Sequence, residues 1–344
     1  MKISFGAYTL LAESIQERVK HAILLEKCGF DSVWVGDHLI ELFSDIKAYD
    51  PWCNLTAIAL NTRRIKLGTC VTDPHRKHPA VLVQSVNTVD QLSGGRVLLG
   101  IGGGEAMNLD PFGIKWDRPI TRLEEYIQVM KELWTSPRAS FSGRFCDLRD
   151  AHVQVELAQK PHPAIYLAAG SPRSRKLVGK IANGWIALAM TPELYRRDII
   201  DVQTGAKEAG RDPESIDVAC TIDIAVSNDA ETARNAVINS GRTLLLCWPH
   251  QLERLGYTST KEFDWVKLLV KEDTERRIKT NLDEVANEAA EQVVIFGTPD
   301  QCVERIEHFT KAGVTHFIFV MHPLDGSYTL LAEKVIPYFR EQTA

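Results

Sequence analysis

The chain has 344 residues, of which 44% are hydrophobic and 25% are charged, as is typical of a packed globular protein. Its formal charge of -5 provides no clustered positive field for phosphate groups, so nucleic acid is not expected as a partner. No apolar run approaches the roughly 20 residues that are needed to span a bilayer, so we expect no membrane contact.

The cysteines and the first residues of the chain indicate a reducing, cytoplasmic setting. The seven cysteines are odd in number, lie far apart and form no C-x-x-C pair, which argues against a disulfide framework and a zinc ribbon. The opening MKISFGAYTLLAES has one basic residue and no small-residue cleavage site, so we interpret it as a strand and not as a signal peptide.

Short β-branched runs alternate with helical stretches from the start of the chain. Ser14 stands three residues before Glu17, which is the capping-box signature of a helix start, and Gly29 marks the end of that helix. In the first half we predict strands at 3–5, 32–35, 66–70 and 97–101, and helices up to residue 28 and at 51–61, 79–92 and 120–134.

The second half repeats this alternation. We predict strands at 164–168, 184–188, 217–226 and 315–320, with helices from about 171, at 192–209, from 229 and at 299–311. Eight apolar strands with helical connections predict an α/β fold, namely a closed parallel (β/α)8 TIM barrel rather than a doubly wound open sheet. We expect residues 1–344 to form a single domain.

Two segments interrupt the alternation, and we interpret both as insertions into the barrel. Residues 140–159 predict an excursion with a short hairpin before the fifth strand. Residues 241–291 predict a longer insertion, with charged helical character between about 267 and 290. Insertions in barrels lengthen the loops and often cover the active site.

The carboxyl ends of the strands are where a barrel of this kind carries its chemistry. The second strand ends in Gly36-Asp37-His38. A neighbouring acid and imidazole at the mouth of a barrel suit hydrogen bonding to a heterocycle and proton transfer near neutral pH. The alternative is that Asp37 caps the next segment and that His38 is only packed.

A glycine-rich loop follows the fourth strand. The run Gly102-Gly103-Gly104 allows the backbone to approach a ligand closely, and Glu105 and Asn108 then offer an acceptor and an amide to the pocket. The alternative is a tight strand-to-helix turn, which glycine-rich segments frequently form.

Two further segments suggest binding sites. A helix starts at Gly170-Ser171-Pro172-Arg173, and its free N–H groups favour an anion, although simple capping also explains Ser171 and Pro172. The run His75-Arg76-Lys77-His78 invites a metal interpretation. Two cations between the imidazoles make a poor cation site, so we expect a solvated or anion-facing loop and no bound metal.

Four sequence runs together resemble the luciferase-like flavin and deazaflavin oxidoreductases. They are VWVGDHL at 33–39, LGTCVTDP at 67–74, NTVDQLSGGR at 87–96 and LGIGGGE at 99–105. The resemblance covers essentially the whole chain and is densest between residues 34 and 134. Within the family, the sequence is most similar to members that use coenzyme F420, among them methylenetetrahydromethanopterin reductases and ketoreductases of the phthiodiolone type.

The resemblance implies a cytoplasmic, homodimeric F420-dependent oxidoreductase with the luciferase-like barrel. A hydride would pass between C5 of the deazaflavin and a carbon of a small-molecule substrate. Asp37 would contact the ring system, His38 would give or take the proton at the substrate, and Glu105 would line the pocket with Asn108 nearby. These assignments make Asp37, His38 and Glu105 the predicted catalytic residues.

The resemblance also implies the surroundings of the cofactor. Cys70–Val71 matches the place where family members carry a non-prolyl cis peptide behind the ring. The segment from Ala168 to Ser171 matches one that holds the phosphate-bearing tail. The predicted cofactor-binding residues are Asp37, Cys70, Val71, Gly102, Gly104, Asn108, Ala168, Ala169, Gly170 and Ser171.

Departures from the family pattern bear on the substrate. Leu42 stands where alcohol and sugar-phosphate dehydrogenases carry an aromatic residue, and no lysine occurs in the segment 187–191 after the sixth strand. A glucose-phosphate substrate is therefore not expected. The placement of Glu105 leaves a methylene-pterin among the candidate substrates, together with a carbonyl or an alcohol. Two alternatives are an FMN-dependent monooxygenase on the same scaffold and a barrel that has lost its chemistry.

Overall fold

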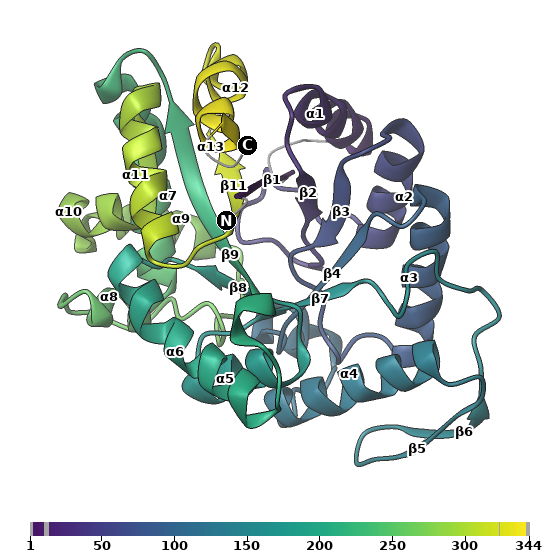
Figure 1. Ribbon diagram of the computed structural model, residues 1–344. Helices are drawn as coiled ribbons and strands as arrows, with labels where there is room; N and C mark the ends of the chain where they lie inside the picture. Colours follow the sequence, from purple (N-terminus) through teal and green to yellow (C-terminus); the bar gives the residue numbers. More distant parts are fainter. Residues whose placement is uncertain (1–2, 10–13, 323, 342–344) are drawn as a thin grey trace.

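The computed structural model describes residues 3–9, 14–322 and 324–341, and within them eight parallel strands form a closed barrel (Figure 1). Each strand pairs with the next, and the last pairs with the first. The strands are β1 (Ser4–Tyr8), β2 (Ser32–Val35), β3 (Lys66–Thr69), β4 (Val97–Ile101), β7 (Ala164–Ala168), β8 (Gly184–Leu188), β9 (Asp217–Val226) and β11 (His316–Met321). The predicted (β/α)8 barrel is confirmed.

Helices cover the outside of the barrel between successive strands (Figure 1). Proline occupies the first helical position of six of them, where its missing N–H costs nothing and its fixed φ favours a helix start. The predicted capping box between Ser14 and Glu17 is present. The helices are α1 (Ile15–Lys27), α2 (Pro51–Asn61), α3 (Pro79–Ser93), α4 (Pro119–Thr135), α5 (Pro172–Ile181), α6 (Pro192–Glu208), α7 (Ala230–Cys247), α11 (Pro299–Lys311), α12 (Ser327–Leu330) and α13 (Ile336–Glu341).

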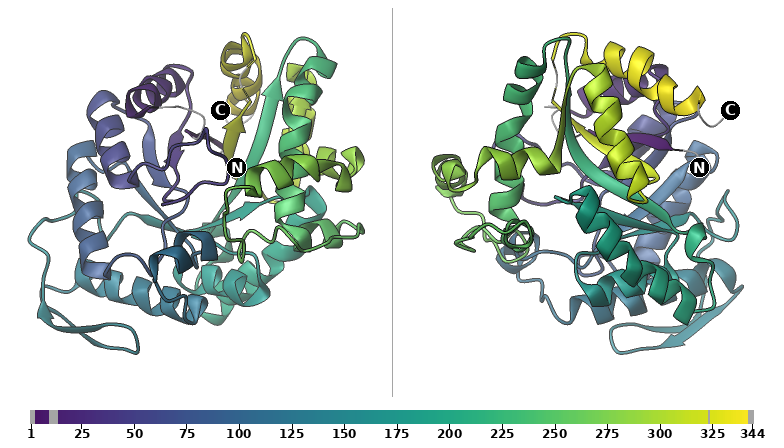
Figure 2. Two further views of the ribbon diagram at one scale, coloured as in Figure 1. Left: turned by 180° about the vertical axis from the view of Figure 1, so that it is seen from behind. Right: turned by 60° about the vertical axis from the view of Figure 1, so that its left-hand side comes forward.

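Both predicted insertions depart from the barrel; the first contains the predicted hairpin, and the second differs from the prediction in where regular structure ends. The first is the hairpin of β5 (Ala139–Ser142) and β6 (Asp147–Ala151), which projects from the barrel at the lower right of Figure 1. In the second, α7 continues to Cys247, so regular structure reaches further than the predicted boundary at 241. The remainder contains α8 (Pro249–Arg254), α9 (Thr274–Thr280) and α10 (Asn287–Ala290), which pack beside α7 (Figure 2).

A ninth strand, β10 (Val294–Gly297), was not predicted from the sequence. It pairs with Asp223–Val226 of β9, beyond the stretch Asp217–Thr221 along which β9 pairs with β8. The long strand β9 therefore has one neighbour near its start and another near its end on the same edge. The strand β10 extends the wall of the barrel at its carboxyl-terminal mouth.

Side chains close the amino-terminal half of the barrel interior. Trp34 and Tyr166 meet edge to face with ring centroids 5.5 Å apart. Glycine is required opposite each ring, because a Cβ at Gly68 would lie 2.2 Å from Trp34 and one at Gly184 would lie 2.2 Å from Tyr166. These rings form a closed floor, so a ligand can reach the interior only from the carboxyl ends of the strands.

Among the described residues, no helix is long and apolar enough to cross a membrane.

Candidate active site

His38 lies between two carboxylates just beyond the end of β2. Its Nδ1 atom is 3.0 Å from Oε1 of Glu41, and its Nε2 atom is 3.3 Å from Oε1 of Glu105. The His38 side chain is 13% exposed, so these contacts act largely away from bulk water. Both contacts favour the protonated form of the imidazole.

The carboxylates raise the pKa of His38. Burial of the imidazole lowers its pKa, but Glu105 and Glu41 together outweigh burial and the repulsion from Arg76, and the pKa rises from 6.5 to about 9. The imidazole of His38 therefore carries its second proton at neutral pH. A buried cation at the mouth of the barrel can donate a proton to a basic atom that approaches it.

Glu105 is held in place by donors from two different parts of the chain. Gly104 has φ +78°, a left-handed conformation that turns the loop after β4 so that Glu105 follows in extended backbone. Nδ2 of Asn108 donates to Oε1 of Glu105 at 2.9 Å, and Nε1 of Trp265 donates to Oε2 at 3.4 Å. Both oxygens of the Glu105 carboxylate thus accept a hydrogen bond.

Asn108 is buried, with 2% of its surface exposed, and connects the two loops that carry His38 and Glu105. Its Oδ1 atom accepts the backbone N–H groups of Leu39 at 2.6 Å and Ile40 at 2.8 Å. The sequence placed Asn108 near the cofactor. The structure adds that the amide bonds to the chain directly after His38.

Asp37, the other predicted catalytic residue, is 4% exposed and pairs with a buried arginine. Nη1 of Arg76 lies 2.9 Å from Oδ1 of Asp37, and Nη2 donates to the Asp37 carbonyl oxygen at 2.6 Å. Nε of the same guanidinium donates to the carboxylate of Asp73. Of the two expectations for the loop at 75–78, solvated or anion-facing, Arg76 agrees with the second, and the anions that it faces are two carboxylates of the protein itself.

The cis peptide bond expected between Cys70 and Val71 is present. Sγ of Cys70 lies 3.9 Å from Oγ1 of Thr221 on β9, and burial raises the pKa of the thiol to about 12. Cys70 is thus a neutral wall residue and not a nucleophile at neutral pH. Val71 faces the glycine-rich loop, since a Cβ at Gly102 would lie 2.9 Å from its Cγ2 atom and 3.4 Å from Cβ of Ala168.

The segment expected to hold the cofactor tail, 168–171, runs from the end of β7 to the start of α5. The Ser171 hydroxyl accepts the Ser174 N–H, and the buried Arg175 donates to the Gly170 carbonyl oxygen at 2.6 Å. On the other side Gly170 is open, because a Cβ added there would meet no atom within 4 Å. The hydrogen bond from Arg175 fixes the loop on one side, and the other side of Gly170 is open, at the positive end of the dipole of α5.

The second insertion forms part of the same site, which the sequence did not reveal. The Val266 carbonyl oxygen accepts the backbone N–H of Ala106 at 3.0 Å, next to Glu105. Trp265 stacks on Trp248 with centroids 4.7 Å apart and lies 6.3 Å from the His38 ring. The pair of tryptophans within the insertion, Trp248 and Trp265, is the sequence signal for this part of the site.

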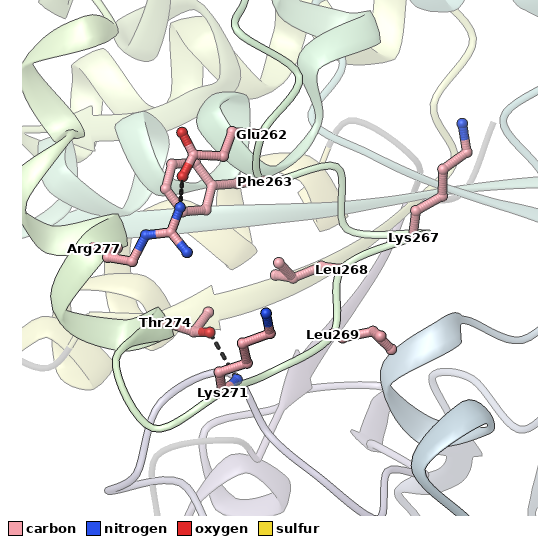
Figure 3. Close-up of a pocket in the computed structure, with 8 residues that line it drawn as sticks. All are labelled: Glu262, Phe263, Lys267, Leu268, Leu269, Lys271, Thr274 and Arg277. Atoms are coloured by element: carbon pink, nitrogen blue, oxygen red, sulfur yellow. Dashed lines mark hydrogen bonds and ion pairs between the residues drawn. The ribbon is translucent and has the colours of Figure 1, made fainter. Parts of the chain in front are cut away.

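A separate pocket lies within the insertion and contains none of the predicted site residues (Figure 3). Its cavity measures about 280 Å³. Arg277 pairs with Glu262 there and lies over the ring of Phe263. Lys267 and Lys271 are solvent-exposed at its edge. We place the chemistry at His38 and not in this pocket, because His38 lies between two carboxylates at the mouth of the barrel.

The predicted site residues form three connected groups. Asp37, His38, Glu105 and Asn108 are joined by direct contacts or by sequence, and Val71, Gly102 and Ala168 lie against one another. The third group is the segment 168–171. Sequence reasoning missed four contributors, although Glu41 stands three residues after His38 and Arg76 three after Asp73. The missed residues are Glu41, Asp73, Arg76 and Trp265.

Comparisons of the sequence and of the structure with known proteins agree with one another. The sequence model of the luciferase-like monooxygenase family matches residues 2–316. A 5,10-methylenetetrahydromethanopterin reductase of Methanolobus tindarius is 29% identical over 92% of this chain and 93% of its own. An F420-dependent glucose-6-phosphate dehydrogenase of Amycolatopsis mediterranei is 30% identical, with 97% and 98% covered. The solved structure of an F420-dependent secondary alcohol dehydrogenase with an F420-acetone adduct is similar at a TM-score of 0.83 and 25% identity, with 97% and 98% covered.

Proposed function

The chain belongs to the luciferase-like monooxygenase family, and we propose that it acts there as a coenzyme F420-dependent oxidoreductase. Its substrate would be a small molecule, either a carbonyl or alcohol or a methylene-pterin. Two of the similar proteins carry F420 in their names, and the third is a methylenetetrahydromethanopterin reductase. The glucose-phosphate substrate of one relative is not proposed, because the segment 187–191 has no lysine.

The observation that carries the proposal is the placement of His38 between two carboxylates at the mouth of the barrel. Its pKa of about 9 keeps the imidazolium populated at neutral pH, so it can protonate the oxygen or nitrogen on which negative charge develops during reduction. In the oxidative direction the neutral imidazole takes that proton. Glu41 and Glu105 stabilise the cationic form and fix the ring between them.

The residues at the mouth fit a cofactor with a planar ring and an anionic tail. The side chains of Val71 and Ala168 pack against Gly102, and Gly170 is open at the start of α5. When bound, F420 supplies the carbon that gives or takes the hydride. We propose that Asp37, Cys70, Val71, Gly102, Gly104 and Asn108 lie around the ring and that Ala168, Ala169, Gly170 and Ser171 hold the tail.

Trp265 supports an apolar or planar substrate. Its ring lies beside His38 and is backed by Trp248, so this side of the site offers an aromatic surface. Carbonyl compounds and pterins both present such faces. The same wall excludes water from the imidazolium, which strengthens its interaction with a developing charge.

We further propose a cytoplasmic homodimer. All seven cysteines are free, as a reducing compartment requires. The apolar side chains Leu60, Val81 and Leu92 are exposed on α2 and α3, two helices that pack together, and their burial would favour a second subunit. Sedimentation of the purified protein measures the oligomeric state directly.

Titration of the purified protein with oxidised F420 and, separately, with FMN tests the cofactor. We expect saturable quenching or polarisation of deazaflavin fluorescence, with no comparable signal for FMN. Reduced F420 should then be consumed on addition of a carbonyl substrate without oxygen uptake. Tight binding of FMN alone, with oxygen uptake on reduction, would instead identify a flavin monooxygenase.

A further inference from the structure

The amide of Asn108 occupies the position between His38 and Glu105 where the two catalytic loops meet. Oδ1 accepts both Leu39 N–H and Ile40 N–H, while Nδ2 donates to Oε1 of Glu105. Oε1 is also the carboxylate oxygen nearest to His38, at 3.3 Å from Nε2. One buried side chain thus bonds to the backbone that follows the imidazole and to the carboxylate that contacts it.

The orientation of the amide follows from its partners. Rotation of the amide by 180° would direct the NH2 group at two backbone N–H donors and the oxygen at a carboxylate, and every contact would then be repulsive. In the present orientation three of its four hydrogen-bonding positions are used within the protein. With 2% of Asn108 exposed, a single N–H remains for any ligand.

We propose that Asn108 is a positioning residue that sets the separation and orientation of His38 and Glu105. The proposal rests on the proposed function, in which His38 transfers the proton. Without the amide, the longer contact from Trp265 is the remaining hydrogen bond of the two to Glu105, and the carboxylate can turn away from the imidazole. The loop after His38 loses two hydrogen bonds at the same time. Both changes weaken the ion pair that keeps His38 protonated.

The first test is independent of turnover. In Asn108→Ala, the pKa of His38 should fall from about 9 toward the ordinary 6.5, because Glu105 is no longer held against the ring. Histidine NMR of the cofactor-free protein measures this pKa, and His38→Gln assigns the signal. Asn235→Ala is the matched control, since Asn235 also donates to a glutamate, Glu231, but on the exposed face of α7. It should leave the His38 signal unchanged.

The second test separates positioning from cofactor binding. Asn108→Asp keeps the two acceptor bonds to the loop but places a carboxylate against Glu105. We expect kcat to fall by about tenfold to a hundredfold. The inflection of its pH profile should move as well. Asn235→Asp, which places a carboxylate beside Glu231, should change none of these values.

Two results would overturn the inference. An unchanged pKa of His38 in Asn108→Ala would show that the amide does not set the contact. A lowered affinity for F420 with a normal kcat and an unmoved pH inflection at saturating F420 would leave Asn108 as a cofactor contact only and not a positioning residue. Should the variants unfold, the wild-type protein still tests the inference. The NMR signals of its Asn108 side-chain NH2 group must shift as His38 titrates. If wild type binds no F420, the proposed function fails while this titration still tests Asn108.

Discussion

Oε1 of Glu105 lies 3.3 Å from Nε2 of His38, and Glu41 approaches the other nitrogen of the same ring at 3.0 Å. An imidazole flanked on both sides by carboxylates gains a proton that it would otherwise lose near pH 6.5. The pH dependence of the reaction rate in each direction follows from this arrangement.

Carbonyl reduction should be fastest below the pKa of His38 and should decline as pH rises through about 9, because the imidazolium is the proton donor. The rate of alcohol oxidation should instead rise as pH rises through this pKa, because the neutral imidazole is the proton acceptor. Initial rates with saturating F420 between pH 6 and about 10.5 measure both limbs. In His38→Gln, the inflection should vanish and kcat should drop by about 10² to 10⁴. Identical profiles for wild type and His38→Gln would contradict the assignment.

The same ion pairs make folding stability depend on pH. The folded-state pKa of His38 is raised, so its contribution is fully present below pH 6.5 and is lost as pH rises through about 9. The difference in free energy of unfolding between wild type and His38→Gln should therefore be largest at pH 6 and shrink toward about pH 10. Urea denaturation at several pH values measures it. A difference that grows with pH would have the wrong sign.

Arg76→Met should destabilise the protein strongly. It leaves the buried carboxylates of Asp37 and Asp73 without their cation, a change that costs about 3–5 kcal/mol in comparable cases. Arg138→Met is the control, because the Arg138–Asp150 pair is exposed and should contribute less than about 1 kcal/mol. Equal denaturation midpoints for the two variants would show that the Arg76 cluster is not stabilising.

Gly170→Ala tests where the cofactor tail lies. The added methyl group meets no protein atom within 4 Å, so the melting temperature should stay unchanged. If the tail passes over this residue, F420 affinity should fall by about tenfold or more, as a steric conflict of 1–3 kcal/mol predicts. Fluorescence titration measures it. Unchanged affinity would move the tail away from the start of α5.

Trp265→Phe removes the N–H donor to Glu105 but keeps an aromatic ring against Trp248. We expect a modest loss of kcat, by about threefold to tenfold, with KM little changed. Trp265→Ala removes the wall as well, so KM should rise together with the loss of kcat. Steady-state kinetics with one carbonyl substrate distinguish them. A KM effect from the Phe variant alone would assign the indole N–H to substrate binding.

The barrel strands were predictable because each is a short apolar run with a helical segment behind it. β10 was missed although Val294–Gly297 is also a short apolar run with a helix behind it, because it follows the insertion and only the fold pairs it with the end of β9 that extends past β8. The end of α7 was placed too early for a similar reason. Its last turns, up to Cys247, are stabilised by packing against the insertion and not by a local stop signal.

The site was predictable where one strand end supplies the residues and unpredictable where tertiary structure joins them. The resemblance implied His38, Glu105 and the cis peptide at Cys70–Val71, and the structure contains that bond. The partners of Arg76 were missed, because its two carboxylates come from separate loops and only the fold brings Asp37 to it. Trp265 lies 160 residues from Glu105 in the chain, and no sequence spacing encodes that contact.

The closed floor of the barrel has a kinetic consequence. The rings of Trp34 and Tyr166 block the amino-terminal end, so cofactor and substrate share one entrance. Whichever molecule lies deeper must arrive first and depart last, and exchange of the inner one waits for the outer one to leave. Turnover should thus follow a compulsory order, in which excess substrate or product traps the inner molecule and slows the cycle.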